Sequence, residues 1–220
     1  MEIIVTSFNA NPNVGLYLYA TDSYCLAGIE VPNKSIKEIE KTLKVPVHQL
    51  NIAGTSLVGV FCAGNSKKLL LPSIAFESEL KKLEKWGIKY TQIKTDLTAL
   101  GNNILCNDKG CLINPEFRDD EIKQIKEALN VPVKKAKIAG LDTVGSLGVI
   151  NDNACLLHTD AVPSDINAVR DVLGLNAEAG TVNFGNPFVK SGIVCNKNGL
   201  IIGSQSSGPE MQYIAEVLKY

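Results

Sequence analysis

The sequence lacks the features that mark several classes of protein. No apolar run approaches the length needed to cross a bilayer, and Met1–Val5 carries no basic region of the kind that opens a signal peptide. Lysine and arginine form no block, and the formal net charge is −1. A protein that holds nucleic acid mainly through phosphates needs a basic face, so we expect no dedicated binding of free nucleic acid, although a local patch is compatible with a neutral total. These absences predict a cytoplasmic protein with no membrane partner.

The six cysteines lack the spacing of a metal site, because no two of them form a Cys-x-x-Cys pair. They fall instead at two equivalent positions of an internal repeat. One set is Cys62, Cys106 and Cys195, and the other is Cys25, Cys111 and Cys155. Free cysteine in a cytosolic protein behaves as a small buried hydrophobe, so we predict structural cysteines, no metal and no cofactor. Cys106 and Cys111 are expected on facing strands of one hairpin.

What the sequence does contain is a repeat of about 44 residues. The pair Val14-Gly15 returns, at steps of 44, 42 and 44 residues, as Val58-Gly59, Leu100-Gly101 and Val144-Gly145. At twice that step, Val45-Pro46-Val47 answers Val131-Pro132-Val133. We place the repeats, within a single domain spanning 1–220, at residues 14–57, 58–99, 100–143, 144–188 and 189–220, with 1–8 completing the last.

The second repeat shows the unit most clearly. A β-favouring stretch, Val58–Cys62, predicts a first strand, and turn residues separate it from a second strand at 69–71. Apolar residues at spacings of four and three predict a helix over Phe76–Trp86, ended by Gly87. Residues Ile88–Ile93 predict a third strand. The repeat is therefore β-β-α-β.

The other repeats predict helices over Ser35–Leu43, Asp119–Asn130, Ser164–Leu173 and Pro209–Lys219. The hydroxyls of Ser35 and Ser164 are expected to cap the first turns of two of these helices. Asp165 is expected to favour the positive end of its helix dipole.

The fifth repeat has no third strand, since Tyr220 follows its helix directly, whereas residues 2–8 form a spare strand before the first repeat. Pairing the spare strand into the last unit closes a ring and removes an open sheet edge. The predicted fold class is thus α/β, a five-bladed pseudo-fivefold α-β propeller of the pentein type. Its helices are expected outside and its strands toward the axis.

Short strings along the whole chain carry a family resemblance. They include Asn13-Val14-Gly15, Thr21–Leu26, Ile52–Thr55, Gly64-Asn65, Leu70-Leu71-Pro72, Ala99–Asn102, Cys106-Asn107-Asp108 and Ala179–Asn183. Their order and spacing resemble the translation initiation factor 6 family, and the compact length is similar to the archaeal form. Where eukaryotic members commonly carry a basic residue after Val182-Asn183, this chain has Phe184.

The resemblance implies a monomeric binding protein and no enzyme. Family members adopt the pentein propeller and dock on the intersubunit face of the large ribosomal subunit, near the sarcin–ricin loop and largely against ribosomal protein uL14. From there they block joining of the small subunit, and in eukaryotes they also accompany ribosome biogenesis. Contact mostly with protein fits the modest charge of this chain.

The loops that lead from one repeat to the next are the candidate ribosome-binding residues, because equivalent loops of a propeller gather at one end. The candidates are Gly15, Leu16, Gly59, Val60, Gly101, Asn102, Asn103, Gly145, Ser146, Asn183 and Asn186. Two interpretations are open for them. The glycines either admit a partner backbone or serve the tight passage between strands, and the amides either contact a partner or cap turns.

Two patterns imitate other functions. Gly54–Gly59 and Gly140–Gly145 both have the form G-x-x-x-x-G of a phosphate-binding loop, but neither is followed by the Lys-Ser/Thr pair that reaches phosphate and magnesium. Nucleotide binding is therefore not expected.

The second pattern is His158-Thr159-Asp160 with Cys195, which suits a pentein guanidine-modifying hydrolase or transferase. Such chemistry needs a thiol of low pKa. Cys195 nevertheless matches Cys62 and Cys106, and His158 matches Asn114, so the repeat alone accounts for both. We expect no catalytic residue and keep the enzyme as the alternative.

Overall fold

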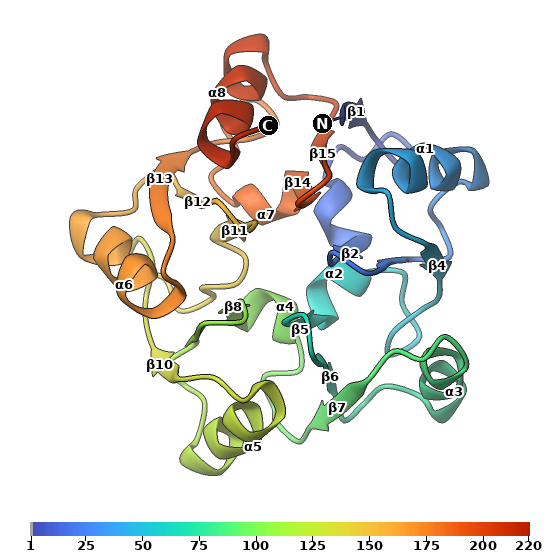
Figure 1. Cartoon of the computed structure of the whole chain (residues 1–220), viewed down its shortest axis with the longest axis vertical. Helices are drawn as coiled ribbons and strands as arrows, with labels where there is room; N and C mark the ends of the chain where they lie inside the picture. The colour runs from blue at the N-terminus through green and yellow to red at the C-terminus, as the bar shows by residue number, and fades with distance from the viewer. Residues whose placement is uncertain (1) are drawn as a thin grey trace.

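The computed structural model describes residues 2–220, which form five units of one three-stranded sheet and one long helix each. In Figure 1 the units surround a common centre, and the long helices lie at the periphery. Units 1 to 5 carry, in order, the helices α1 (Asn33–Leu43), α3 (Glu77–Lys85), α5 (Asp119–Leu129), α6 (Pro163–Leu173) and α8 (Gly208–Leu218). The five predicted helices are confirmed, with ends that differ by one or two residues.

The sheets share one strand pattern. Unit 1 has β2 (Leu18–Ala20), β3 (Cys25–Ala27) and β4 (Val47–Gln49); unit 2 has β5 (Ala63–Gly64), β6 (Leu69–Pro72) and β7 (Tyr90–Ile93); unit 3 has β8 (Ile104–Cys106), β9 (Cys111–Ile113) and β10 (Val133–Lys135); unit 4 has β11 (Gly148–Ile150), β12 (Ala154–His158) and β13 (Asn176–Gly180); unit 5 has β14 (Ile193–Asn196), β15 (Gly199–Gly203) and β1 (Glu2–Thr6). In each sheet the middle strand is antiparallel to the first strand and parallel to the third.

The first strand of the chain belongs to the last sheet. β1 pairs with β15 in parallel register, from Glu2 opposite Gly199 to Thr6 opposite Gly203. The N-terminal strand therefore supplies the third strand that the fifth unit lacks, as predicted.

The predicted first strand of the repeat is wrong at its beginning. Val58–Phe61 forms a helical turn, α2, and strand β5 starts only at Ala63. Similar turns open three further units: η1 (Val14–Leu16), α4 (Leu100–Asn103) and α7 (Val189–Gly192). Valine and phenylalanine favour strands, but the need to bring the chain back to the next unit overrides that local preference.

The two predicted serine caps are also wrong. The capping positions are Pro32 and Val162, and Ser35 and Ser164 lie inside the first turn. In four helices a carboxylate three residues after the capping residue accepts a hydrogen bond from the backbone amide of that residue. The pairs are Glu79 with Phe76 (2.8 Å), Glu121 with Arg118 (2.7 Å), Asp165 with Val162 (3.1 Å) and Glu210 with Ser207 (2.7 Å).

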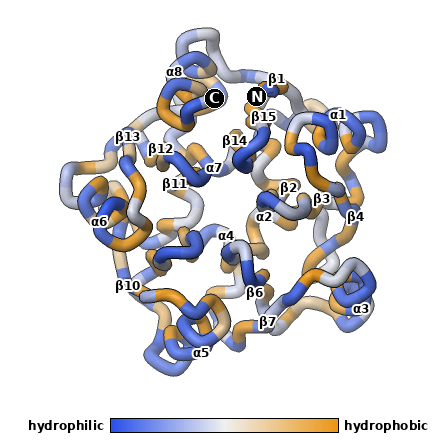
Figure 2. The backbone as a smooth tube through the Cα atoms, viewed as in Figure 1, coloured by the Kyte–Doolittle hydropathy of each residue, from blue (hydrophilic) through white to orange (hydrophobic). Residues whose placement is uncertain are grey.

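Each hydrophobic core is shared by two neighbouring units. Leu26 of unit 1 packs with Leu69, Leu71 and Leu83 of unit 2, and the remaining pairs of neighbours repeat this arrangement. The peripheral helices alternate between hydrophobic and hydrophilic residues, as expected for helices with one buried face (Figure 2). All six cysteines are buried and free, and Cys106 lies directly opposite Cys111. Their predicted role as core residues is confirmed.

Hairpin asparagines join neighbouring units as well. Their Nδ2 atoms donate to the last carbonyl of the next helix, in the pairs Asn65–Leu129 (3.0 Å), Asn107–Leu173 (2.9 Å), Asn151–Leu218 (2.8 Å) and Asn196–Leu43 (2.9 Å). Each bond satisfies a carbonyl that a helix end leaves without a partner. The fourth bond connects the last unit to the first across 153 residues of sequence.

Candidate functional site

Strand direction separates two ends of the molecule. The helical turns precede the first strand of a unit and the hairpin follows it, so turns and hairpins lie at opposite ends. The loops that follow the second and third strands lie at the same end of the molecule as the helical turns, because these strands run antiparallel to the first. We call this end the junction face; it comprises residues 7–17, 28–32, 50–61, 73–76, 94–103, 114–118, 136–147, 159–162, 181–192 and 204–207.

The four predicted glycines of the junction face are buried and pack against each other. A Cβ at Gly59 would lie closer than 3.0 Å to the carbonyl oxygen of Gly15, and the same relation links Gly101 to Gly59 and Gly145 to Gly101. A Cβ at Gly15 would meet the carbonyl oxygen of Lys190. At these positions the structure supports the packing interpretation, because only glycine allows the backbones to approach so closely.

Two predicted amides are buried and satisfied inside the protein. Asn103 Nδ2 donates to the carbonyl of Ala99 (3.0 Å), and its Oδ1 accepts from Asn114 Nδ2 (2.7 Å). Asn183 Nδ2 donates to the carbonyl of Pro12 (3.0 Å), which connects the loop between units 4 and 5 to the loop before unit 1. Both side chains hold loops in place.

The remaining predicted residues reach the surface. Leu16, Val60, Asn102, Ser146 and Asn186 are all half-buried. Ser146 Oγ donates to the carbonyl of Thr143 (2.8 Å), and Asn186 Nδ2 donates to Ser191 Oγ (3.1 Å). One face of each of these residues therefore remains available to a partner.

The fifth turn is α7, Val189–Gly192, at the predicted start of the fifth repeat. Val189 continues the apolar series Val14, Val58, Leu100 and Val144. The candidate Asn186 lies in the loop that leads to this turn. Lys190 consequently occupies the place that glycine holds in the other four turns.

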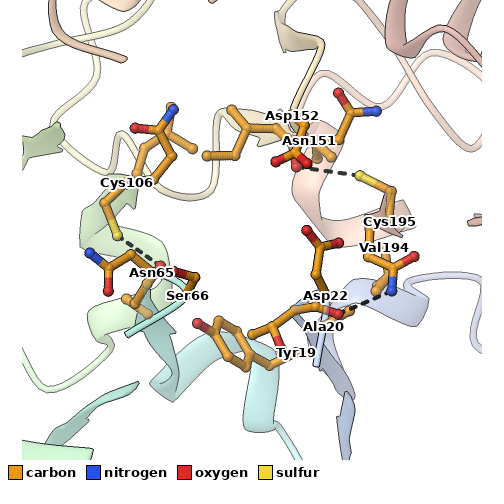
Figure 3. A pocket seen from close by; sticks show the side chains of 18 of the residues that line it. Tyr19, Ala20, Asp22, Asn65, Ser66, Cys106, Asn151, Asp152, Val194 and Cys195 are labelled. Atoms are coloured by element: carbon orange, nitrogen blue, oxygen red, sulfur yellow. Dashed lines mark hydrogen bonds between the residues drawn. The ribbon is translucent and has the colours of Figure 1, made fainter. Parts of the chain in front are cut away.

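Lys190 lies at one end of a central cavity of about 280 Å³. Asp22, Asp108 and Asp152, at the hairpins, line the opposite end, and in Figure 3 Asp22 and Asp152 point toward the middle of the cavity. Lys190 Nζ donates to the carbonyl of Gly101 (2.6 Å). Burial lowers the pKa of Lys190 to about 8, against the weaker opposing effect of nearby thiols.

Lys190→Met is expected to increase the free energy of unfolding at pH 7 by about 1 kcal/mol, after solvent screening in the cavity and the lost hydrogen bond are allowed for. Because the folded-state pKa of Lys190 lies below its ordinary value, its ionisation costs stability in full below pH 8. The cost disappears as the pH rises toward the ordinary lysine value. Urea denaturation at pH 7 and pH 9.5 measures the difference, with exposed Lys123→Met as control. An equal effect of the two substitutions would contradict the assignment.

Exposed hydrophobic side chains gather on the junction face. They are Ile29, Ile74, Phe76, Leu141, Val162, Phe184 and Phe188. Phe184, at the tip of the loop before α7, is 82% exposed. Exposed hydrophobic side chains on one end of the molecule are candidates for contact with a partner, and the sequence had drawn attention only to Phe184.

Neither enzyme residue has the required chemistry. Cys195 Sγ donates to the carbonyl of Ile150 (3.4 Å), and burial raises the pKa of this thiol to about 12, the opposite of an activated nucleophile. His158 Nδ1 accepts from the amide of Asp160 (3.1 Å), and its ring meets Phe188 edge-on. Within residues 2–220 no group of acidic, histidine and cysteine side chains could hold a metal ion.

In the two segments that resemble phosphate-binding loops, backbone amides are already hydrogen-bonded to carboxylates of the protein. Glu79 accepts the amides of Ala53 (2.8 Å) and Gly54 (2.9 Å), and Asp165 accepts the amide of Ala139 (2.9 Å). These are the backbone donors that a phosphate would need. The geometry agrees with the expectation that the loops bind no nucleotide.

Residues 3–217 match the model of the eIF-6 family. The chain belongs to the eIF-6 family. It is 35% identical to "Translation initiation factor 6" of Staphylothermus marinus, covering 96% of this chain and 95% of that protein. It is 34% identical to the protein of the same name from Pyrococcus abyssi, covering 99% of each. The eIF-6 family consists of translation initiation factors and not of enzymes, so the enzyme alternative is set aside.

One solved structure with a weaker likeness to this eIF-6 family member is an agmatine deiminase of C. jejuni. It is 10% identical, with a TM-score of 0.44, and the match covers 76% of this chain and 65% of the deiminase. That likeness supports no conclusion about fold or activity. No helix within residues 2–220 is long and apolar enough to cross a membrane.

Proposed function

We propose that this eIF-6 family member binds the intersubunit face of the large ribosomal subunit through its junction face and thereby prevents the small subunit from joining. Its partners there are ribosomal protein uL14 and the vicinity of the sarcin–ricin loop. It acts as a monomer in the cytoplasm, in translation initiation and ribosome biogenesis.

A closed ring of five blades, the pentein propeller, is part of this proposal. Support comes from the bonds that join the last unit to the first. β1 pairs with β15, Asn196 donates to the carbonyl of Leu43, and Ser191 Oγ donates to Asn13 Oδ1 (3.2 Å). A closed ring holds the five turns at fixed relative positions, which is the pre-organisation that a docking surface needs.

The junction face supplies the observation that carries the proposal. It carries exposed hydrophobic side chains and the half-buried Asn102, and its loops include carboxylates such as Glu30, Glu116 and Asp160 as well as the basic Lys94 and Lys137. Clustered basic residues, which would favour rRNA phosphates, are not what this surface offers. An apolar surface of mixed charge fits a mainly protein partner such as uL14.

The test is co-sedimentation with cognate large subunits on sucrose gradients at moderate salt, combined with a subunit-joining assay. The wild-type protein is expected to bind and to reduce joining. Phe184→Ala with Phe188→Ala, and separately Asn102→Ala, are expected to weaken binding about tenfold. Tyr213→Ala, an exposed aromatic on helix α8, is the matched control and should bind normally. Failure of the wild-type protein to bind large subunits would refute the proposal.

A further inference from the structure

The boundary between units 1 and 2 lacks the asparagine bond found at the other four boundaries. Thr21 stands at the hairpin position of Asn65, Asn107, Asn151 and Asn196. Thr21 Oγ1 accepts the amides of Ser23 (3.2 Å) and Tyr24 (3.1 Å), as each asparagine Oδ1 accepts the amides two and three residues later. Threonine has no side-chain amide, however, and its hydroxyl donates to the carbonyl of Tyr24 (3.0 Å) instead of to the end of the neighbouring helix.

The helix end at this boundary is different as well. Trp86, the single tryptophan of the sequence, stands where the other long helices have leucine before a left-handed residue. His48, in strand β4 of unit 1, stacks on Trp86 with ring centroids 4.5 Å apart and planes 9° from parallel. An aromatic pair thus replaces the hydrogen bond between the two units.

A hollow of about 440 Å³ opens beside this pair. Unit 1 lines it with Ser23, Tyr24, Pro46 and His48, and unit 2 with residues 66–68 and 86–89. Lys67, Lys68 and Lys89 belong to this lining, whereas no carboxylate does among these described residues. The side chains that line the hollow therefore carry net positive charge in a protein of net charge −1, with the Asp108 carboxylate next to them, accepting the amide of Ser66 (3.0 Å).

We propose that this hollow binds single-stranded RNA. The lysines would neutralise backbone phosphates, and a base would stack against the aromatic pair, as in proteins that combine a basic groove with aromatic platforms. Charge alone would suit an acidic peptide equally well. The half-buried Trp86 and His48 favour RNA, because every nucleobase has a flat face that can stack.

The hollow is independent of the junction face. Ser23 and Ser66–Lys68 belong to hairpins, which lie at the opposite end of the strands from the turns. A partner bound at the junction face would leave it open. The RNA proposal consequently stands or fails separately from the ribosome-docking proposal.

The experiment titrates the full-length protein with a 12-nucleotide oligouridylate. Fluorescence anisotropy of a labelled oligonucleotide gives the affinity, and quenching of the single tryptophan by the unlabelled one reports stacking at the hollow. Lys67→Glu with Lys89→Glu is expected to weaken binding at least tenfold and to reduce the log–log salt slope by about 1.4, two phosphate contacts at about 0.7 each. Lys123→Glu with Lys126→Glu, exposed on helix α5, has the same net charge and should bind within twofold of wild type.

A second variant restores the repeat. Thr21→Asn supplies the missing donor to the end of helix α3 and is expected to narrow the hollow, so RNA affinity should fall at least fivefold while the fold is retained. Absence of tryptophan quenching, or equal losses in the two charge-reversed variants, would overturn the proposal. Tighter binding and stronger quenching with a dodecaglutamate peptide would overturn it in favour of an acidic protein partner.

Discussion

Gly59→Ala is expected to lower the free energy of unfolding by about 3 kcal/mol or more, measured by urea denaturation. The added methyl group would lie closer than 3.0 Å to the carbonyl oxygen of Gly15 and to that of Leu18. Both obstacles are backbone atoms of the neighbouring unit, so no side-chain rotation relieves the clash. Relief requires the two units to move apart, which weakens the core that they share.

The control for this substitution is Gly208→Ala. Gly208 lies in the first turn of helix α8, and nothing would come within 4 Å of its added Cβ. Alanine is the better helix former, so stability should stay the same or rise by up to about 1 kcal/mol. If Gly59→Ala were as stable as Gly208→Ala, the close contacts between the turns would not be limiting in solution.

Glu79→Ala is expected to cost about 3 kcal/mol. The buried carboxylate of Glu79 accepts three amides, those of Phe76, Ala53 and Gly54, at 2.8 to 2.9 Å. It thereby joins the start of helix α3 to a turn in which Ala53 has a φ of 53° and Gly54 a φ of 76°. Without the carboxylate, three partly buried amide donors lose their charged acceptor and the left-handed turn loses its support.

Glu77→Ala separates this effect from the helix dipole. Glu77 lies in the same first turn, but its carboxylate is exposed and forms an ion pair with Lys81 (2.7 Å). Its loss should cost below about 1 kcal/mol. Glu79→Gln retains one acceptor oxygen and should fall between the two alanine variants. Equal destabilisation by Glu77→Ala and Glu79→Ala in thermal and urea unfolding would show that the amide contacts add nothing.

The repeat made much of the architecture predictable. Apolar residues three and four apart, as at Leu80 and Leu83, located the helices because burying one face of a helix requires that spacing. The missing strand after helix α8 placed Glu2–Thr6 in the last sheet. The burial of the cysteines was also predictable, because equivalent positions of a repeat share one environment.

The repeat was less informative about the candidate site. Burial divided the predicted residues: Asn103 and Asn183 bond inward, whereas Asn102 and Asn186 reach the surface. Asn102 and Asn103 are adjacent in the helical turn α4, so composition could not distinguish them. The hollow between units 1 and 2 also escaped notice, because Thr21 and Trp86 are 65 residues apart in sequence.

By itself the sequence determined the number of units, the order of their elements, the place of the first strand and the family. Those properties depend on which residues are buried, and the spacing of apolar residues along the sequence shows this directly. The tertiary structure decided that Val58–Phe61 forms a helical turn and which asparagine amide binds the end of which helix. It also decided that four turns need glycine and that Lys190 lies at the central cavity. Each of these depends on a neighbour from another unit, and the energy of such a contact exists only once the units have packed together.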